Sequence, residues 1–76
     1  MQIFVRNDSI KTMTFDVEPT ITVEQLKEEI TNKSNIKTER LIFAGKELQN
    51  NKNLNYYNIQ KECTIFMVFR QLGGKQ

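Results

Sequence analysis

The segment TVEQLKEEITNKSN, residues 22–35, carries the pattern that decides the fold. Three of its apolar residues follow the spacing of a single stripe along an α-helix, namely Val23, Leu26 and Ile30. Thr22 and Gln25 are three residues apart, which is the spacing of a reciprocal capping box at a helix N-terminus. Asn35 tolerates the left-handed backbone that ends a helix. We therefore predict a helix from about residue 23 to residue 33.

Two strands are expected before this helix. Apolar residues alternate with other residues on either side of the polar turn RNDS, residues 6–9, and they are Met1, Ile3, Val5, Met13, Phe15 and Val17. This pattern is typical of a hairpin with one buried face. Pro19 ends the second strand, because proline lacks the backbone N–H that a strand ladder needs.

Three more strands are expected after the helix. In LIFAGKEL, residues 41–48, an alternating strand leads to an Ala44-Gly45 turn and then to a short strand that ends at Leu48. A loop follows at residues 50–53, and CTIFMVF, residues 63–69, is the last strand. A helix with one apolar stripe is covered by one sheet face. We therefore predict an α+β domain, in which a mixed sheet of about five strands wraps around the helix with the first and last strands at its centre.

The predicted core consists of apolar residues that face inward in this arrangement. They are Ile3, Val5, Val17, Val23, Leu26, Ile30, Leu41, Leu48, Leu54, Ile59, Ile65 and Met67. A chain of 76 residues forms one domain and buries a smaller share of its surface than a larger one, so this core must be compact.

Composition excludes several classes of protein. Hydrophobic residues make up 38% and charged residues 26%, which describes a soluble globular domain. The formal net charge of +2 comes from interspersed charges and gives no basic block for nucleic acid. The start, MQIFVRNDS, turns polar too soon for a signal peptide or a membrane span. We expect a cytoplasmic or nuclear monomer that binds neither nucleic acid nor membrane.

No catalytic or metal site is expected. Cys63 has no histidine to act as its base, because the chain contains none, and it has no second cysteine for a disulfide. The carboxylates are scattered, and Gly45, Gly73 and Gly74 do not make a phosphate-binding loop. We predict a protein that is not an enzyme and takes no cofactor or metal.

The predicted outer face of the sheet carries a surplus of apolar residues. Ile65, Met67 and Phe69 face the helix, so Phe66 and Val68 point outward, as Ile42 does on its own strand. Lone apolar residues on a surface are ordinary. Three on neighbouring strands favour a docking patch.

The chain closes with RQLGGKQ, residues 70–76, where a glycine pair makes either a loose end or a functional tail. Several segments resemble the ubiquitin family: MQIFV at 1–5, VEP at 17–19, RLIFAGK at 40–46, YNIQKE at 57–62 and the pair Gly73-Gly74. The resemblance covers nearly the whole chain. It implies the β-grasp fold over residues 1–70 and a flexible tail at 71–76, with a two-residue extension beyond the glycines.

The resemblance also implies a function. In this family the carboxylate of the last glycine is adenylated by an activating enzyme, passed as a thioester to a conjugating enzyme and joined to a target lysine as an isopeptide. The chain is thus expected to be a protein modifier, released from a polyprotein precursor by cleavage after Gly74. A processing protease or an adjacent processing domain would make that cut. The alternative is a binding module that stays within a larger multidomain protein.

The family's recognition residues match this chain unevenly. Ile42 and Val68 match the two central members of the family's hydrophobic patch, which ubiquitin-receptor domains bind. Phe66 stands where the family has histidine, and Asp8 replaces the patch's leucine. The resemblance also implies that Arg70 and Arg40 serve activating-enzyme and surface recognition.

Further differences concern the lysines and two short segments. Chain-building positions of the family are occupied by Lys46 and Lys61, our candidate acceptors, and by Lys11, Lys27 and Lys33. Arg6 and Glu29 remove two such lysines. The segment IKTER, residues 36–40, is shorter than its counterpart, so local rearrangement is expected there. In the tail, Gln71 and Leu72 stand where ubiquitin has a leucine and an arginine.

Overall fold

The computed structural model describes residues 1–69. The predicted boundary at residue 70, the tail at 71–76, the pair Gly73-Gly74 and Arg70 lie outside the described residues. The elements in chain order are β1 (Gln2–Asn7), β2 (Ile10–Asp16), α1 (Val23–Ser34), β3 (Thr38–Phe43), β4 (Lys46–Glu47), the 3₁₀ helix η1 (Leu54–Tyr57) and β5 (Thr64–Phe69).

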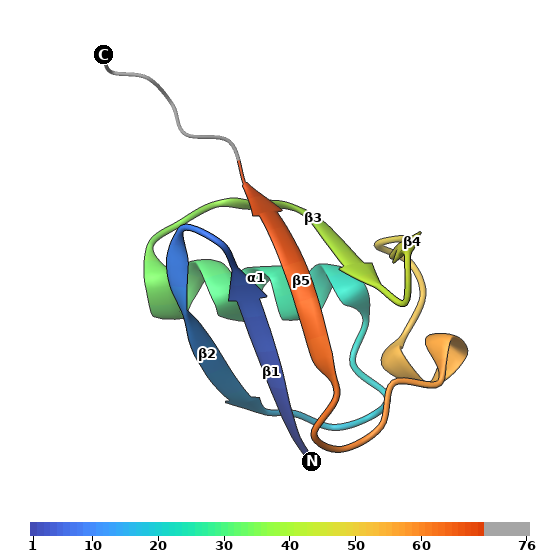
Figure 1. Cartoon of the computed structure of the whole chain (residues 1–76). Helices are drawn as coiled ribbons and strands as arrows, with labels where there is room; N and C mark the ends of the chain where they lie inside the picture. The colour runs from blue at the N-terminus through green and yellow to red at the C-terminus, as the bar shows by residue number, and fades with distance from the viewer. Residues whose placement is uncertain (70–76) are drawn as a thin grey trace.

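A single mixed sheet packs with one face against α1 (Figure 1). Its strand order is β2-β1-β5-β3-β4. β1 and β5 pair in parallel, whereas the β1–β2, β3–β5 and β3–β4 pairs are antiparallel. The predicted α+β fold, with five strands around one helix and the first and last strands inside the sheet, is confirmed. This is the β-grasp arrangement.

The ends of α1 are fixed by the residues that the sequence indicated. The Thr22 side chain accepts a hydrogen bond from Gln25 N at 3.1 Å, and Gln25 Oε1 accepts one from Thr22 N at 2.9 Å. Asn35 has φ 60° and ψ 21°, in the left-handed region, and its N–H donates to Thr31 O. The capping box and the Asn35 stop are confirmed, and the helix runs one residue beyond the predicted end, to Ser34.

The core lies between α1 and the inner face of the sheet. All twelve predicted core residues are buried, and Phe15 joins them at 6% exposure. Phe15 pairs with Ile3 across the hairpin, and the Lys33 ammonium lies 4.9 Å from the centre of its ring. The ammonium also donates to Thr14 O at 2.6 Å. Lys33 therefore helps to cover the end of the core that Phe15 fills.

Strands β1, β2 and β3 are longer than predicted, because polar residues continue their hydrogen-bond ladders. β1 extends through Arg6 to Asn7 and β2 begins at Ile10, so the turn is shorter than RNDS. β3 begins at Thr38, which pairs with Phe69, and not at residue 41. Backbone groups make the ladder whatever the side chain is, so polar residues in the strands do not show in an apolar pattern. Thr38 is one of them, although its side chain is buried.

Leu41→Ala should lower the free energy of unfolding by about 2–5 kcal/mol, because Leu41 is fully buried and the neighbouring strands cannot fill the space it leaves. Urea titration followed by circular dichroism measures this loss. Thr12→Ala, at an exposed position of β2, is the control and should change stability by less than about 0.5 kcal/mol. An unchanged midpoint for Leu41→Ala would contradict its place in the core.

Candidate functional site

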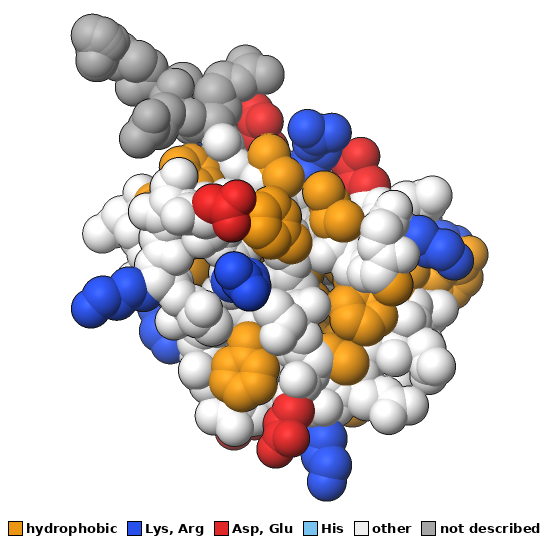
Figure 2. Space-filling model, in the orientation of Figure 1, with side chains coloured by type: hydrophobic (Ala, Val, Ile, Leu, Met, Phe, Trp, Pro, Cys, Tyr) orange, Lys and Arg blue, Asp and Glu red, His pale blue; other side chains and the backbone are white. Residues whose placement is uncertain are grey.

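The three apolar residues predicted to face outward lie together on β3 and β5. Ile42 pairs directly with Phe66, and Val68 follows two residues later on the same face of β5. We call Ile42, Phe66 and Val68 the outer patch. Each is partly exposed, whereas Leu41, which lies beside them on the inner face, is fully buried. Figure 2 shows hydrophobic side chains grouped over β5 and β3 on this face.

Charged side chains surround the outer patch. Arg6 pairs with Phe66 in the parallel β1–β5 ladder, and Arg40 pairs with Val68 across β3 and β5. Arg40 Nη1 lies 3.8 Å from Glu47 Oε1, with about half of each side chain exposed. An ion pair in that environment contributes little to stability. The arrangement is therefore an apolar centre with a charged rim, which is the usual composition of a protein-binding surface.

Asp8 lies in the β1–β2 turn, at the edge of this face, and is exposed. The preceding residue fixes the turn: Asn7 Nδ2 donates to Met67 O at 2.7 Å, and Asn7 Oδ1 accepts from Ser9 N at 2.7 Å. Nothing in the sequence pattern singled out Asn7, because its partner on β5 is distant in the chain. Figure 2 shows an acidic side chain beside the hydrophobic group, over the end of the sheet where this turn lies.

The five lysines at chain-building positions of the family fall into two groups. Lys27 Nζ donates to Glu39 O at 2.9 Å, and Lys33 Nζ to Thr14 O, so these two ammonium groups are held by the backbone. The side chains of Lys11, Lys46 and Lys61 are exposed. Within residues 1–69, no hydrogen bond or ion pair holds their ammonium groups. Among the lysines at chain-building positions, these three are the best placed to react with an external electrophile.

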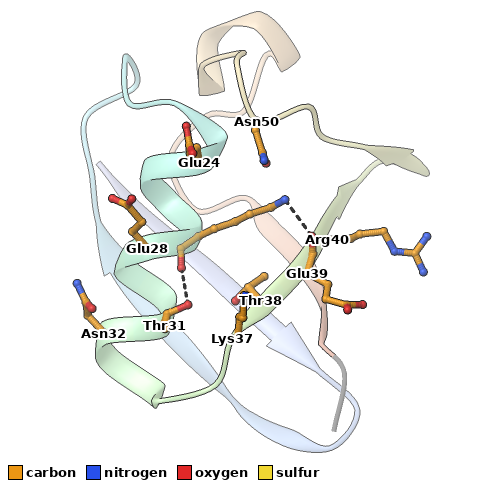
Figure 3. A pocket seen from close by; sticks show the side chains of 10 residues that line it. Glu24, Glu28, Thr31, Asn32, Lys37, Thr38, Glu39, Arg40 and Asn50 are labelled. Carbon is orange, nitrogen blue, oxygen red and sulfur yellow. Dashed lines mark hydrogen bonds between the residues drawn. The ribbon is translucent and has the colours of Figure 1, made fainter. Parts of the chain in front are cut away.

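A groove of about 890 Å³ separates α1 from the start of β3 (Figure 3). Lys27, which lines the groove, donates from its Nζ to Glu39 O on β3, and Thr31 Oγ1 donates to Lys27 O at 3.0 Å. Thr38 lies in the wall, 7% exposed, and its Oγ1 has no partner among the described residues. Both acidic and basic side chains line the groove, so its charge favours neither an anionic nor a cationic ligand.

The described residues contain neither a metal-binding cluster nor a membrane-spanning helix. No group of three or more His, Cys, Asp or Glu residues able to hold a metal ion occurs within residues 1–69. In the same part of the chain, no helix has the length and hydrophobicity to cross a membrane. Cys63 is half-buried directly before β5, and its Sγ accepts a hydrogen bond from Gln60 N at 3.3 Å.

Comparison with models of known protein families gives a match. The model described as the ubiquitin family matches residues 3–72 of this chain. The chain belongs to the ubiquitin family. Its relatives include the NEDD8-like protein RUB3 of Arabidopsis thaliana, which is 29% identical over 97% of both chains. Ubiquitin-like protein NEDD8 of Dictyostelium discoideum is 30% identical over 97% of this chain and 99% of its own length. This ubiquitin-family domain is not an enzyme.

A further relative places a similar domain inside a much larger protein. The E3 ubiquitin-protein ligase UPL5 of Arabidopsis thaliana is 38% identical over 92% of this chain, which corresponds to 8% of that ligase. The family thus contains both short chains of this size and modules within long ones.

Lysine acylation should follow the two groups described above. With a limiting amount of an N-hydroxysuccinimide acetate, Lys11, Lys46 and Lys61 should be modified several times faster than Lys27, because the Lys27 ammonium must first leave Glu39 O. Peptide mass spectrometry after brief exposure measures the rates. The same chain in denaturant is the control, since there all four lysines should react alike. Equal rates in the folded protein would contradict the contact of Lys27.

Proposed function

We propose that this chain is a ubiquitin-like protein modifier, joined to target lysines through the carboxylate of Gly74. The observation that supports it most is the match to NEDD8-like relatives over nearly their whole length. The sequence adds Gly73-Gly74 at the place where this family carries its reactive terminus. The expected partners are activating and conjugating enzymes, a processing protease or domain and ubiquitin-receptor domains, in the cytoplasm or the nucleus.

The proposed reaction needs a free carboxylate at Gly74. Cleavage of the Gly74–Lys75 peptide bond by water supplies it and releases the segment that begins at Lys75. The carboxylate then attacks the α-phosphate of ATP with loss of pyrophosphate, and a cysteine thiolate of the activating enzyme displaces AMP to form a thioester. After transfer to a conjugating enzyme, a lysine amine attacks the thioester and expels the thiolate. Glycine suits the acyl position because it has no Cβ to obstruct the nucleophile.

A second candidate function is a binding module that is never cleaved. The match to a short segment of the ligase UPL5 favours it, because a similar domain there forms part of a long chain. Both candidate functions use the outer patch for recognition. The Gly74–Lys75 bond is cleaved in the modifier and stays intact in the binding module. Formation of a thioester at Gly74 therefore distinguishes the two functions.

The outer patch is the proposed docking surface for receptors. Ile42→Ala should weaken binding to a ubiquitin-receptor domain by about 1 kcal/mol or more, because Ile42 would lose its apolar contact at the centre of the interface. Asp8→Leu should strengthen the same binding, since a carboxylate is costly to cover without a cation. NMR titration locates the contact. Thr12→Ala is the control, and shifts that avoid residues 42, 66 and 68 would defeat the proposal.

The conjugation proposal is tested with two lengths of chain. Given ATP, magnesium and activating enzymes from the source cell, the chain that ends at Gly74 should form a thioester that reducing agent releases. The chain that ends at Gln76 is the control and should form none, because its Gly74 carbonyl is in a peptide bond. Gly74→Ala in the shorter chain should slow the transfer, since a methyl group crowds the acyl carbon.

Arg70→Ala should weaken recognition by the same activating enzymes, a role that rests on the family resemblance. Gel electrophoresis without reducing agent measures all these thioesters. Failure of the Gly74 form with all of the cell's own activating enzymes would leave the binding module as the better function.

A further inference from the structure

We infer that the β1–β2 turn gives the outer patch a fixed negative edge, and that the patch takes an amphipathic helix of another protein with a Lys or Arg placed against Asp8. This inference rests on the proposed docking at Ile42, Phe66 and Val68, and it names the chemistry of the partner. Three observations support it: the way Asn7 is held, the unpaired state of Asp8 and the pairing of the strands beneath the patch.

Asn7 attaches the turn to the strand that carries the patch. Its amide nitrogen donates to Met67 O at 2.7 Å, and Met67 lies between the two patch members of β5. Its amide oxygen accepts the Ser9 N–H at 2.7 Å, which closes the turn over Asp8. Asn7 is partly buried, and the β1–β2 register shifts between Val5 and Asn7. The backbone of Asp8 is therefore fixed on both sides, at residues 7 and 9.

Asp8 itself has no charged partner. Its side chain is exposed, and no ion pair reaches it within residues 1–69. The nearest cation along the chain is Arg6, which pairs with Phe66 on the neighbouring strand and makes no ion pair with Asp8. A partner that covers the patch removes water from this carboxylate, which is unfavourable unless the partner supplies a cation. Charge complementarity therefore selects a Lys or Arg at this edge.

The strands beneath the patch exclude one mode of binding and favour another. β5 is paired on both sides, with β1 and β3, and β3 is paired with β5 and β4. Their backbone groups are already used, so a partner cannot add a strand here. It must bind through side chains. A helix with one apolar face can cover the outer patch and still present a charged residue at its border.

A selection from a peptide library tests the chemistry without a known partner. The probe is a phage-displayed library of amphipathic helices with a fixed Leu and Ala face and border positions randomised among Lys, Gln and Glu. Peptides selected on the unaltered chain should carry Lys at one border position. Asp8→Lys should exchange that preference for Glu, and Arg6→Ala should keep it. Ile42→Ala should reduce capture, which shows that the peptides bind at the outer patch.

The outcomes distinguish this inference from the docking on which it rests. Capture that depends on Ile42 but shows no preference for Lys would overturn the inference and leave the docking proposal standing. No capture, or capture that is insensitive to Ile42→Ala, contradicts both. Self-association of the chain that Ile42→Ala abolishes would assign the patch to a second copy and would also overturn the inference. None of these results bears on the thioester test of Gly74.

Asn7 is inferred to be a positioning residue, and a matched pair of variants tests it. For the unaltered chain, the Lys form of a selected peptide should bind about two- to fivefold tighter than its Glu form, as for an exposed ion pair, and the difference should shrink in high salt. Asn7→Ala should bring this ratio close to one and change the affinity of the Gln form by less than about twofold.

Ser9→Ala is the control for Asn7→Ala. It leaves the backbone N–H that Asn7 Oδ1 accepts, so the preference for Lys should remain. Circular dichroism shows whether each variant is folded, and fluorescence anisotropy with labelled peptides gives the ratios. An Asn7→Ala chain that is folded and retains the full preference for Lys would overturn the positioning role.

Discussion

The structure depends on the need of α1 to bury one apolar stripe. Val23, Leu26 and Ile30 are fully buried, and the inner face of the sheet supplies the residues that cover them. The helix is too short to be stable in water alone, so its stability comes from this contact. Leu54 and Ile59 close the core at one end, where Leu54 N donates to Ile21 O and Val23 N to Lys52 O. The segment that contains η1 is thereby tied to the start of the helix.

The packing of α1 on one face of the sheet gives each strand inward positions, which face the helix, and outward positions, which do not. Because side chains alternate along a strand, each inward residue of β3 and β5 has an outward neighbour. Leu41, Ile65 and Met67 fill the core, and the outward positions are free of that constraint. Apolar residues at those outward positions are not needed for folding. Our proposal assigns Ile42, Phe66 and Val68 at those positions to the docking of a partner, and the charged residues around them would limit which partner fits.

Lysines that look alike in the sequence differ in the folded chain for the same reason. Lys27 extends from α1 to the backbone of β3, and Lys33 extends from the last turn of α1 to the backbone of β2. Both contacts exist because the sheet packs on the helix. Lys11, Lys46 and Lys61 lie on β2, β4 and a turn, outside that contact, and their ammonium groups remain in water. A lysine that matches a chain-building position of the family is thus not always free to react, because its ammonium group can be held by the backbone.

The sequence alone determined the helix, its two caps, the order of the elements and the core, together with membership of the ubiquitin family. The structural features depend on spacing between residues close in the chain, and Thr22, Gln25 and Asn35 act within one or two turns. Family membership rests instead on the segments that match the family. The tertiary structure decided the full lengths of β1, β2 and β3, the state of Lys27 and the tie from Asn7 to Met67, which are 60 residues apart. Such contacts follow from strand register and from packing between elements, and local spacing does not encode either one.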